Sequence, residues 1–196
     1  MRTIILFTLT GLMLLAASAF AGHALDAPPV IAPKPGDILA DMALQGAMTP
    51  EQARYLGLSQ DAAPPTLADI KADYLLVEFF SMYCPYCQHE APHVNDLFAL
   101  VSKSPEADTV KMLGIGIGNS PFEVDYFREK FTIPMPLFTD EDYAVHKRVG
   151  EVGTPFFLLL KRVGNGATWE VAHTQEGPFD AMPAFHQTIL HAAGLK

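Results

Sequence analysis

The feature that most constrains the fold is a pair of cysteines three positions apart, in the segment Cys84-Pro85-Tyr86-Cys87. The apolar run that precedes it, residues 74–80, is rich in aromatic residues and is typical of a buried strand. A helix is expected from about residue 85 to 103, so the pair lies where a strand ends and a helix begins. Two cysteines are too few for a disulfide-stapled scaffold or a four-cysteine zinc site.

The position of each cysteine predicts its chemistry. A thiol at a helix N-terminus lies beside unsatisfied backbone N–H groups and the positive end of the helix dipole, which stabilise the thiolate. Cys84, at the cap, is therefore the expected attacking thiolate. Cys87, one turn inside the helix, is expected to resolve the mixed disulfide and leave a Cys84–Cys87 disulfide. The alternatives are a structural disulfide or half of a metal site.

The elements after the cysteines alternate between strand and helix. The sequence predicts strands over 110–117, 156–162 and 168–174, a short extended piece over 134–138, and helices over 122–131, 140–149 and 180–193. Strand, helix and strand in succession imply parallel pairing, and Gly164-Asn165-Gly166 predicts a hairpin between the last two strands. The expected class is α/β, with a central mixed sheet flanked by helices.

Residues 74–98 resemble the active-site strand and helix of thioredoxin-fold proteins, which kink this helix at the position of Pro92. Gly153-Thr154-Pro155, just before an apolar strand, is similar to the cis-proline loop of the same fold. The resemblance covers roughly residues 66–193. It implies a thioredoxin-like fold in which Thr154 and Pro155 hold the substrate chain opposite the cysteines.

Spacing narrows the resemblance to the TlpA/ResA/DsbE group. Cys84 and Pro155 are 71 positions apart, which exceeds the spacing of a plain thioredoxin by about one strand-helix unit inserted between the cysteine helix and the cis-proline strand. The pattern Cys-x-x-Cys-x-x-Glu-x-Pro, which ends in Glu90 and Pro92, also resembles this group.

The active-site segment departs from the group in ways that leave the direction of electron flow open. Tyr83 stands where the group usually has Trp, and Phe79-Phe80-Ser81 with Cys-Pro-x-Cys resembles the active site of DsbA. The dipeptide Pro85-Tyr86 is similar to that of glutaredoxins. These two residues tune the thiolate and are counted among the expected substrate contacts, with Thr154 and Pro155.

Two acids near the cysteines are candidate proton carriers. Glu78 lies inside an apolar strand, where a carboxylate is costly unless it is paired or protonated, and six residues before Cys84. This place matches the buried acid of thioredoxin and DsbA, so the resemblance implies a proton acceptor for Cys87. Glu90 is the second candidate. The alternatives are a strand-edge acid that points to water and an exposed acid on the helix face.

The first residues have the layout of a secretory signal peptide, with one base, an apolar run and cleavage expected after Ala21. The alternative is an uncleaved membrane anchor. Residues 22–65 are expected to form a proline-rich arm with a short helix begun by Thr49 and Pro50, and residues 66–196 the thioredoxin-like domain. Either form of the leader places the domain in an extracytoplasmic or periplasmic compartment.

These features predict an exported thiol:disulfide oxidoreductase with Cys84, Cys87 and Glu78 as catalytic residues and with no diffusible cofactor or metal. Expected partners are cysteine-containing exported proteins and a membrane thiol electron donor or acceptor, with a reductant in cytochrome c maturation as one implied role. The net charge of −9 argues against nucleic acid. The alternative is a copper metallochaperone that uses the cysteines with His89 or His93.

Overall fold

The computed structural model describes residues 31–59, 64–164, 166, 168–179 and 181–195. The predicted signal peptide, residues 1–21, lies outside them. Within these ranges no helix combines the length and apolar character needed to cross a membrane. The elements in chain order are β1 (Ile38–Ala40), α1 (Pro50–Leu56), a 3₁₀ turn (Leu67–Asp69), β2 (Tyr74–Phe80), α2 (Pro85–Lys103), β3 (Val110–Ile117), α3 (Pro121–Phe131), β4 (Leu137–Asp140), α4 (Ala144–Arg148), β5 (Phe156–Val163), β6 (Thr168–Glu176) and α5 (Met182–Ala192).

The six strands form one mixed sheet in the order β1-β6-β5-β2-β3-β4, as predicted for an α/β fold. Strands β2, β3 and β4 are parallel, whereas β5 runs antiparallel to β2 and β6 antiparallel to β5. The ends of β2, β3 and β4 therefore share one edge, here called the carboxyl end, where β5 begins. In chain order β4 and α4 stand between α3 and β5. Whether this unit is an insertion relative to a plain thioredoxin stays a prediction.

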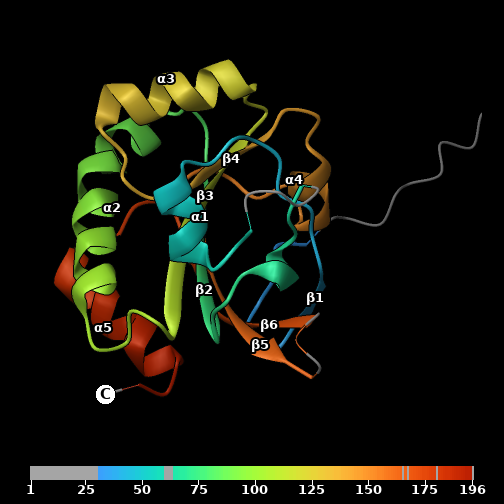
Figure 1. Cartoon of the computed structure of the whole chain (residues 1–196), viewed down its shortest axis with the longest axis vertical. Helices are drawn as coiled ribbons and strands as arrows, with labels where there is room; N and C mark the ends of the chain where they lie inside the picture. Colours follow the sequence, from blue (N-terminus) through green and yellow to red (C-terminus); the bar gives the residue numbers. More distant parts are fainter. Residues whose placement is uncertain (1–30, 60–63, 165, 167, 180, 196) are drawn as a thin grey trace, which may run out of the picture.

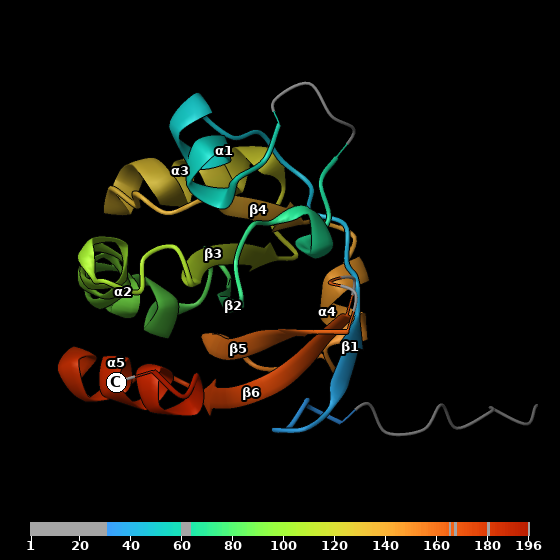
Figure 2. The ribbon, with the colours of Figure 1, turned by 60° about the horizontal axis from the view of Figure 1, so that its bottom comes forward.

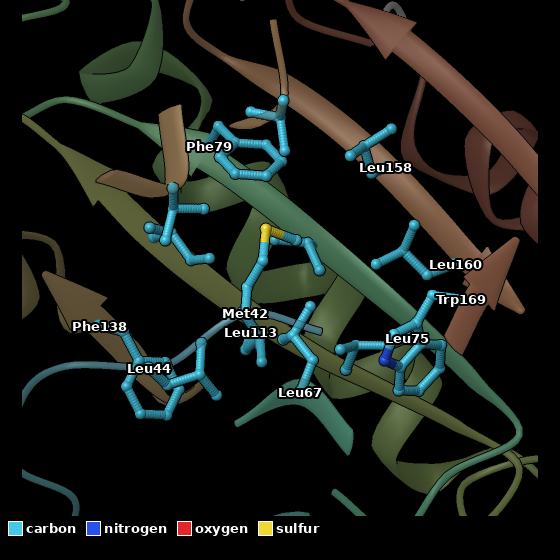
Figure 3. Close-up of a cluster of buried hydrophobic side chains, with 14 of the residues drawn as sticks. Met42, Leu44, Leu67, Leu75, Phe79, Leu113, Phe138, Leu158, Leu160 and Trp169 are labelled. Atoms are coloured by element: carbon cyan, nitrogen blue, oxygen red, sulfur yellow. The ribbon is translucent and has the colours of Figure 1, made fainter. Parts of the chain in front are cut away.

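The sheet separates two layers of side chains. Helices α2 and α5 lie on one side of it and α4 lies on the other (Figures 1 and 2). Because side chains alternate along a strand, Phe79 enters one cluster of buried residues and its neighbour Phe80 enters the second. The first cluster also holds Trp169 and residues of the N-terminal segment (Figure 3), whereas the second holds Cys87.

The described part of the expected N-terminal arm is built into the domain, which corrects the prediction that the core begins later. Strand β1 pairs with β6, with Ile38 opposite Glu170, and covers an edge that would otherwise carry unpaired backbone groups. Met42 and Leu44 are buried in the first cluster, where Leu44 lies beside Phe138 (Figure 3). Helix α1 has the predicted start, because Thr49 and Gln52 form a capping box.

The strands and helices around the cysteines match the predictions, but the helix expected over 140–149 is shorter. Asp140 is the last residue of β4, and α4 begins only at Ala144 because Tyr143 adopts a left-handed backbone conformation. Asp140 still caps this helix, since its carboxylate accepts hydrogen bonds from the backbone N–H groups of Val145 and His146, each at 2.8 Å. The cap therefore acts across a turn that the sequence pattern did not indicate.

Candidate active site

Cys84 is the N-cap residue of α2, directly after the loop that leaves β2. Pro85 occupies the first turn, where its missing N–H costs no helical hydrogen bond. The sulfur of Cys84 accepts a hydrogen bond from the backbone N–H of Cys87 at 3.3 Å. Cys84 is half-buried, whereas Cys87 is fully buried, and both are free thiols. The structure thus offers one sulfur to a partner and keeps the other behind it.

The cis-proline loop lies against the reactive sulfur, as predicted. The bond between Thr154 and Pro155 is cis, and the carbonyl oxygen of Thr154 lies 3.1 Å from the Cys84 Sγ, which donates to it. This contact joins residues 70 positions apart, because β5 begins beside the end of β2, with Phe156 opposite Phe79. The loop therefore forms one wall of the site.

The pKa values of the two thiols are shifted in opposite directions. Burial raises the pKa of Cys84, but hydrogen bonds with the side chains of Cys87 and Thr154 and with backbone N–H groups at the helix start together outweigh it, so the pKa lies below its ordinary value. Burial raises the pKa of Cys87 far above the ordinary value, and the nearby Cys84 thiol and Glu78 carboxyl add to the rise. This difference favours Cys84 as the thiolate and Cys87 as the stored thiol.

Both candidate acids are buried, so neither is the solvent-facing acid of the alternative interpretation. Glu78 is 4 % exposed and Glu90 is 2 % exposed. Burial, together with the charges of Glu90 and Cys84, raises the pKa of Glu78 to about 8. Glu90 accepts a hydrogen bond from the backbone N–H of Phe179 at 3.3 Å, and its other oxygen lies 3.5 Å from Nδ1 of His93. Two carboxyl groups therefore lie beneath the redox pair.

The expected substrate contacts Pro85 and Tyr86 face solvent, with Tyr86 66 % exposed. His89 and His93, the metal candidates, have ring centroids 6.1 Å apart on α2. Among the described residues, no group of three or more histidine, cysteine or acidic side chains is placed to hold a metal ion. The structure therefore adds no support for the copper interpretation.

Sequence reasoning missed Asn119, which fixes the loop in front of Cys84. This fully buried side chain accepts a hydrogen bond from the backbone N–H of Met82 at 2.9 Å, and its amide lies 3.5 Å from the hydroxyl of Ser81. Asn119 follows β3, the parallel neighbour of β2, so both loops emerge at the same edge. A polar residue directly after a buried parallel strand was the available signal.

The mixed sheet, the cysteine pair at the start of α2 and the cis-proline loop define a thioredoxin-like protein. The AhpC/TSA family matches residues 36–171, and the chain belongs to this family.

Individual relatives agree with the predicted group. The thiol-disulfide oxidoreductase ResA of Geobacillus thermodenitrificans is 24% identical over 98 residues, which are 50% of this chain and 54% of that protein. The chain thus spans about half the length of the curated relatives it matches. Two crystal structures share the fold. StoA from Bacillus subtilis has a TM-score of 0.53 and 15% identity, covering 79% of this chain and 98% of StoA. A secreted Mycobacterium tuberculosis disulfide oxidoreductase homologous to DsbE has a TM-score of 0.52 and 17% identity, covering 66% of this chain and 90% of that protein.

Proposed function

We propose that this protein is an exported thiol:disulfide oxidoreductase that acts on cysteines of exported proteins through Cys84 and Cys87. The observation that carries the proposal is the asymmetry of the pair. Cys84 is reachable and its pKa is lowered, whereas Cys87 is buried and its pKa is raised, with its backbone N–H 3.3 Å from the Cys84 sulfur. Thiol-disulfide exchange needs one accessible thiolate and a second thiol within reach of the first.

The reaction runs in two displacements. The Cys84 thiolate attacks one sulfur of a substrate disulfide, forms a mixed disulfide and expels the other substrate sulfur as a thiolate. The Cys87 thiol then loses its proton, and its thiolate attacks the Cys84 sulfur. The second substrate sulfur leaves, and the Cys84–Cys87 disulfide forms. Two electrons have passed from the protein to the substrate.

Glu78 is the proposed acceptor of the Cys87 proton. It lies behind the pair on β2, and its charge contributes to the raised pKa of Cys87. A base with a pKa of about 8 is ionised often enough near neutral pH to take the proton and returns it readily. Glu90, whose charge raises the pKa of Glu78, is the second carboxyl of this site. No diffusible cofactor enters these steps.

The surroundings of Cys84 favour a reductant over a strong oxidant. Burial opposes the thiolate, and within the described part of the chain no cationic side chain contributes to the lowered pKa of Cys84. DsbA is a strong oxidant because its reduced form, which carries the thiolate, is strongly stabilised. We therefore assign the chain to disulfide reduction outside the cytoplasm, with cytochrome c maturation as one pathway and a membrane thiol donor to restore the thiols.

The reduction potential of the Cys84–Cys87 couple tests this proposal. We expect a value nearer to that of thioredoxin, about −270 mV, than to that of DsbA, about −120 mV. In parallel, Cys87→Ser should accumulate mixed disulfides with substrate proteins, because the resolving thiol is gone. A couple that never forms the intramolecular disulfide would overturn the function itself, whereas a potential near that of DsbA would reverse only its direction.

A further inference from the structure

Three loops meet beside Cys84 at the carboxyl end of the sheet. They follow β2, β3 and β4, which are neighbouring parallel strands. Direct contacts join them. The backbone N–H of Gly118 donates to the carbonyl of Asp140 at 3.0 Å, and the hydroxyl of Thr139 donates to the carbonyl of Asn119. The Asn119 side chain in turn holds Met82. The three loops therefore form one continuous surface that begins at the reactive sulfur.

Exposed aromatic side chains gather on this surface. Eight large hydrophobic side chains of the described residues are exposed, and the five aromatic ones among them all follow β2, β3 or β4. We call these five the aromatic rim: Tyr83, Tyr86, Phe122, Tyr126 and Tyr143. Their exposed fractions reach 77 % at Phe122. A monomeric protein rarely collects exposed aromatic rings beside a reactive group unless a partner covers them.

Two contacts set the rim in place. The hydroxyl of Tyr83 donates a hydrogen bond to the carboxylate of Glu123, which links the loop before Cys84 to the first turn of α3. The ring of Tyr143 lies over Gly118, where any Cβ would collide with it. Tyr83 and Tyr143 are thus held in place by residues of neighbouring loops, so the rim is an ordered surface rather than a set of scattered side chains.

Carboxylates border the aromatic rim at Phe122 and at Tyr143. Glu123 follows Phe122 directly, and Glu141 and Asp142 immediately precede Tyr143. None of these three carboxylates forms an ion pair with any residue in the described part of the chain. Exposed bases near the rim are Lys130, whose Nζ lies 5.9 Å from the centroid of the Tyr126 ring, and Lys147 and Arg148 on α4. The carboxylates without an ion pair therefore lie next to Phe122 and Tyr143, whereas Tyr126 already has a lysine over its ring.

We propose that the aromatic rim is the docking surface for the substrate segment next to the attacked cysteine, and that this segment is extended and positively charged. This inference rests on the proposed function and adds its substrate class. Aromatic faces attract lysine and arginine side chains, and carboxylates at the border of a surface steer basic partners toward it. Three strands about 4.8 Å apart span about 10 Å, which three or four residues of extended chain cover.

Matched peptide disulfides test the proposal with the full reduced protein. Two synthetic peptides share one intramolecular disulfide and differ only in flanking residues, four lysines in one and four glutamates in the other. We expect kcat/KM for the lysine peptide to exceed that for the glutamate peptide by about tenfold at low salt, and the ratio to shrink as salt is raised. Reaction with neutral 4,4′-dithiodipyridine, which is too small to cover the rim, measures the thiol alone.

Two variants and their controls locate the effect. Phe122→Ala should lower kcat/KM for the lysine peptide about threefold, whereas Ile38→Ala, which also removes an exposed apolar side chain but on edge strand β1, should not. Glu141→Lys should reduce the preference for the lysine peptide, whereas Asp73→Lys, at the other end of β2, should leave it unchanged. All four should react normally with dithiodipyridine.

Equal rates for the two peptides, or a preference that Phe122→Ala and Glu141→Lys do not change, would overturn the docking proposal while leaving the redox function intact. A dimer at assay concentration that Phe122→Ala dissociates would also overturn it, because a second copy would then be the occupant. Loss of reaction with dithiodipyridine in the unmodified protein would instead contradict the proposed function.

Discussion

The two ends of the central sheet differ in how far their functional groups are used up by contacts within the molecule. At the amino end, where β2 begins, the guanidinium of Arg162 donates to the backbone carbonyls of four residues and lies 4.4 Å from the ring centroid of Trp169. The four carbonyls belong to Ala68, Ile70, Ala72 and Gly166. At the carboxyl end, Cys84 and the aromatic rim remain exposed or half-exposed.

We relate this difference to stability at the amino end and to the proposed thiol-disulfide exchange at the carboxyl end. Arg162 uses its donors inside the molecule, so backbone carbonyls at its end of the sheet are satisfied by internal hydrogen bonds. The carboxyl end keeps a reactive sulfur, an acid of raised pKa and uncovered aromatic rings. In open α/β sheets, ligands bind at this same end of the parallel strands.

The largest effect is expected from Cys84→Ser, which should reduce disulfide exchange to the uncatalysed rate because the nucleophile is gone. Serine is a favourable N-cap residue and can still accept from the N–H of Cys87, so thermal stability should hardly change. Turnover of a peptide disulfide and thermal unfolding together check this. A marked loss of stability would show that the open end also holds the fold together.

Arg162→Ala should instead lower stability and leave the rate of exchange unchanged. It leaves several carbonyls without a donor and removes the packing on Trp169, so we expect the free energy of unfolding to fall by about 2–4 kcal/mol. The rate of exchange per folded molecule should stay the same. Urea denaturation measures the free energy of unfolding. Turnover at urea concentrations below the unfolding transition measures the rate of exchange per folded molecule. The control, Lys161→Ala, removes an exposed neighbour and should cost less than about 0.5 kcal/mol.

Glu78→Gln should change both activity and stability. We expect resolution of the mixed disulfide to slow about 100-fold, because the amide cannot accept a proton, and the rise of this rate with pH toward 8 to disappear. Single-turnover release of substrate from Cys84 over a pH series measures this step. A variant that keeps the wild-type pH profile would assign the proton transfer to another group.

The stability effect of the same substitution has a defined sign. The pKa of Glu78 rises from an ordinary 4.5 to about 8 on folding, so the folded state binds the proton more tightly than the unfolded chain. Stability from this group is complete below pH 4.5 and is lost as pH rises to about 8. Glu78→Gln should therefore match the wild type in acid and exceed its stability above pH 8. Unfolding at several pH values checks the crossover.

The smallest effect is expected at the border of the rim. The hydrogen bond to Glu123 raises the pKa of Tyr83, with burial and the charge of Glu123 adding to it. Glu123→Gln should return the pKa of Tyr83 toward its ordinary value without altering the reaction of Cys84 with a small disulfide. Carbon NMR of labelled tyrosine through an alkaline titration measures the shift. An unchanged Tyr83 signal would show that the two loops are not joined there in solution.

The sequence predicted where the cysteine pair lies in the fold because the signals for that position are local. Cys84 and Pro85 indicate a helix start, and the apolar run of β2 predicts the strand before it. Contacts between distant segments left no such pattern. Nothing in the sequence near Asn119 says that it holds Met82, 37 positions away, and nothing near Arg162 names the carbonyls it binds.

The N-terminal segment was misjudged for a physical reason. Strand β1 has three residues and follows a proline-rich stretch, so its pairing depends on the open edge of β6 rather than on its own propensity. The alternation of Met42 and Leu44 was the one available signal that this segment is buried. The left-handed conformation at Tyr143, which shortened α4, likewise left no local pattern, and the ring of Tyr143 lies over Gly118 in a different loop.

The division of the core by the sheet also separates the redox pair from half of the molecule. Cys87 belongs to the cluster under α2, α3 and α5, whereas the N-terminal segment packs into the cluster on the opposite face. Losses of side-chain volume in the two clusters should therefore add in their cost to stability, because the sites share few partners. Sequence drift around Met42 and Leu44 can weaken the fold while the potential of the cysteines is preserved, so the two properties can evolve independently.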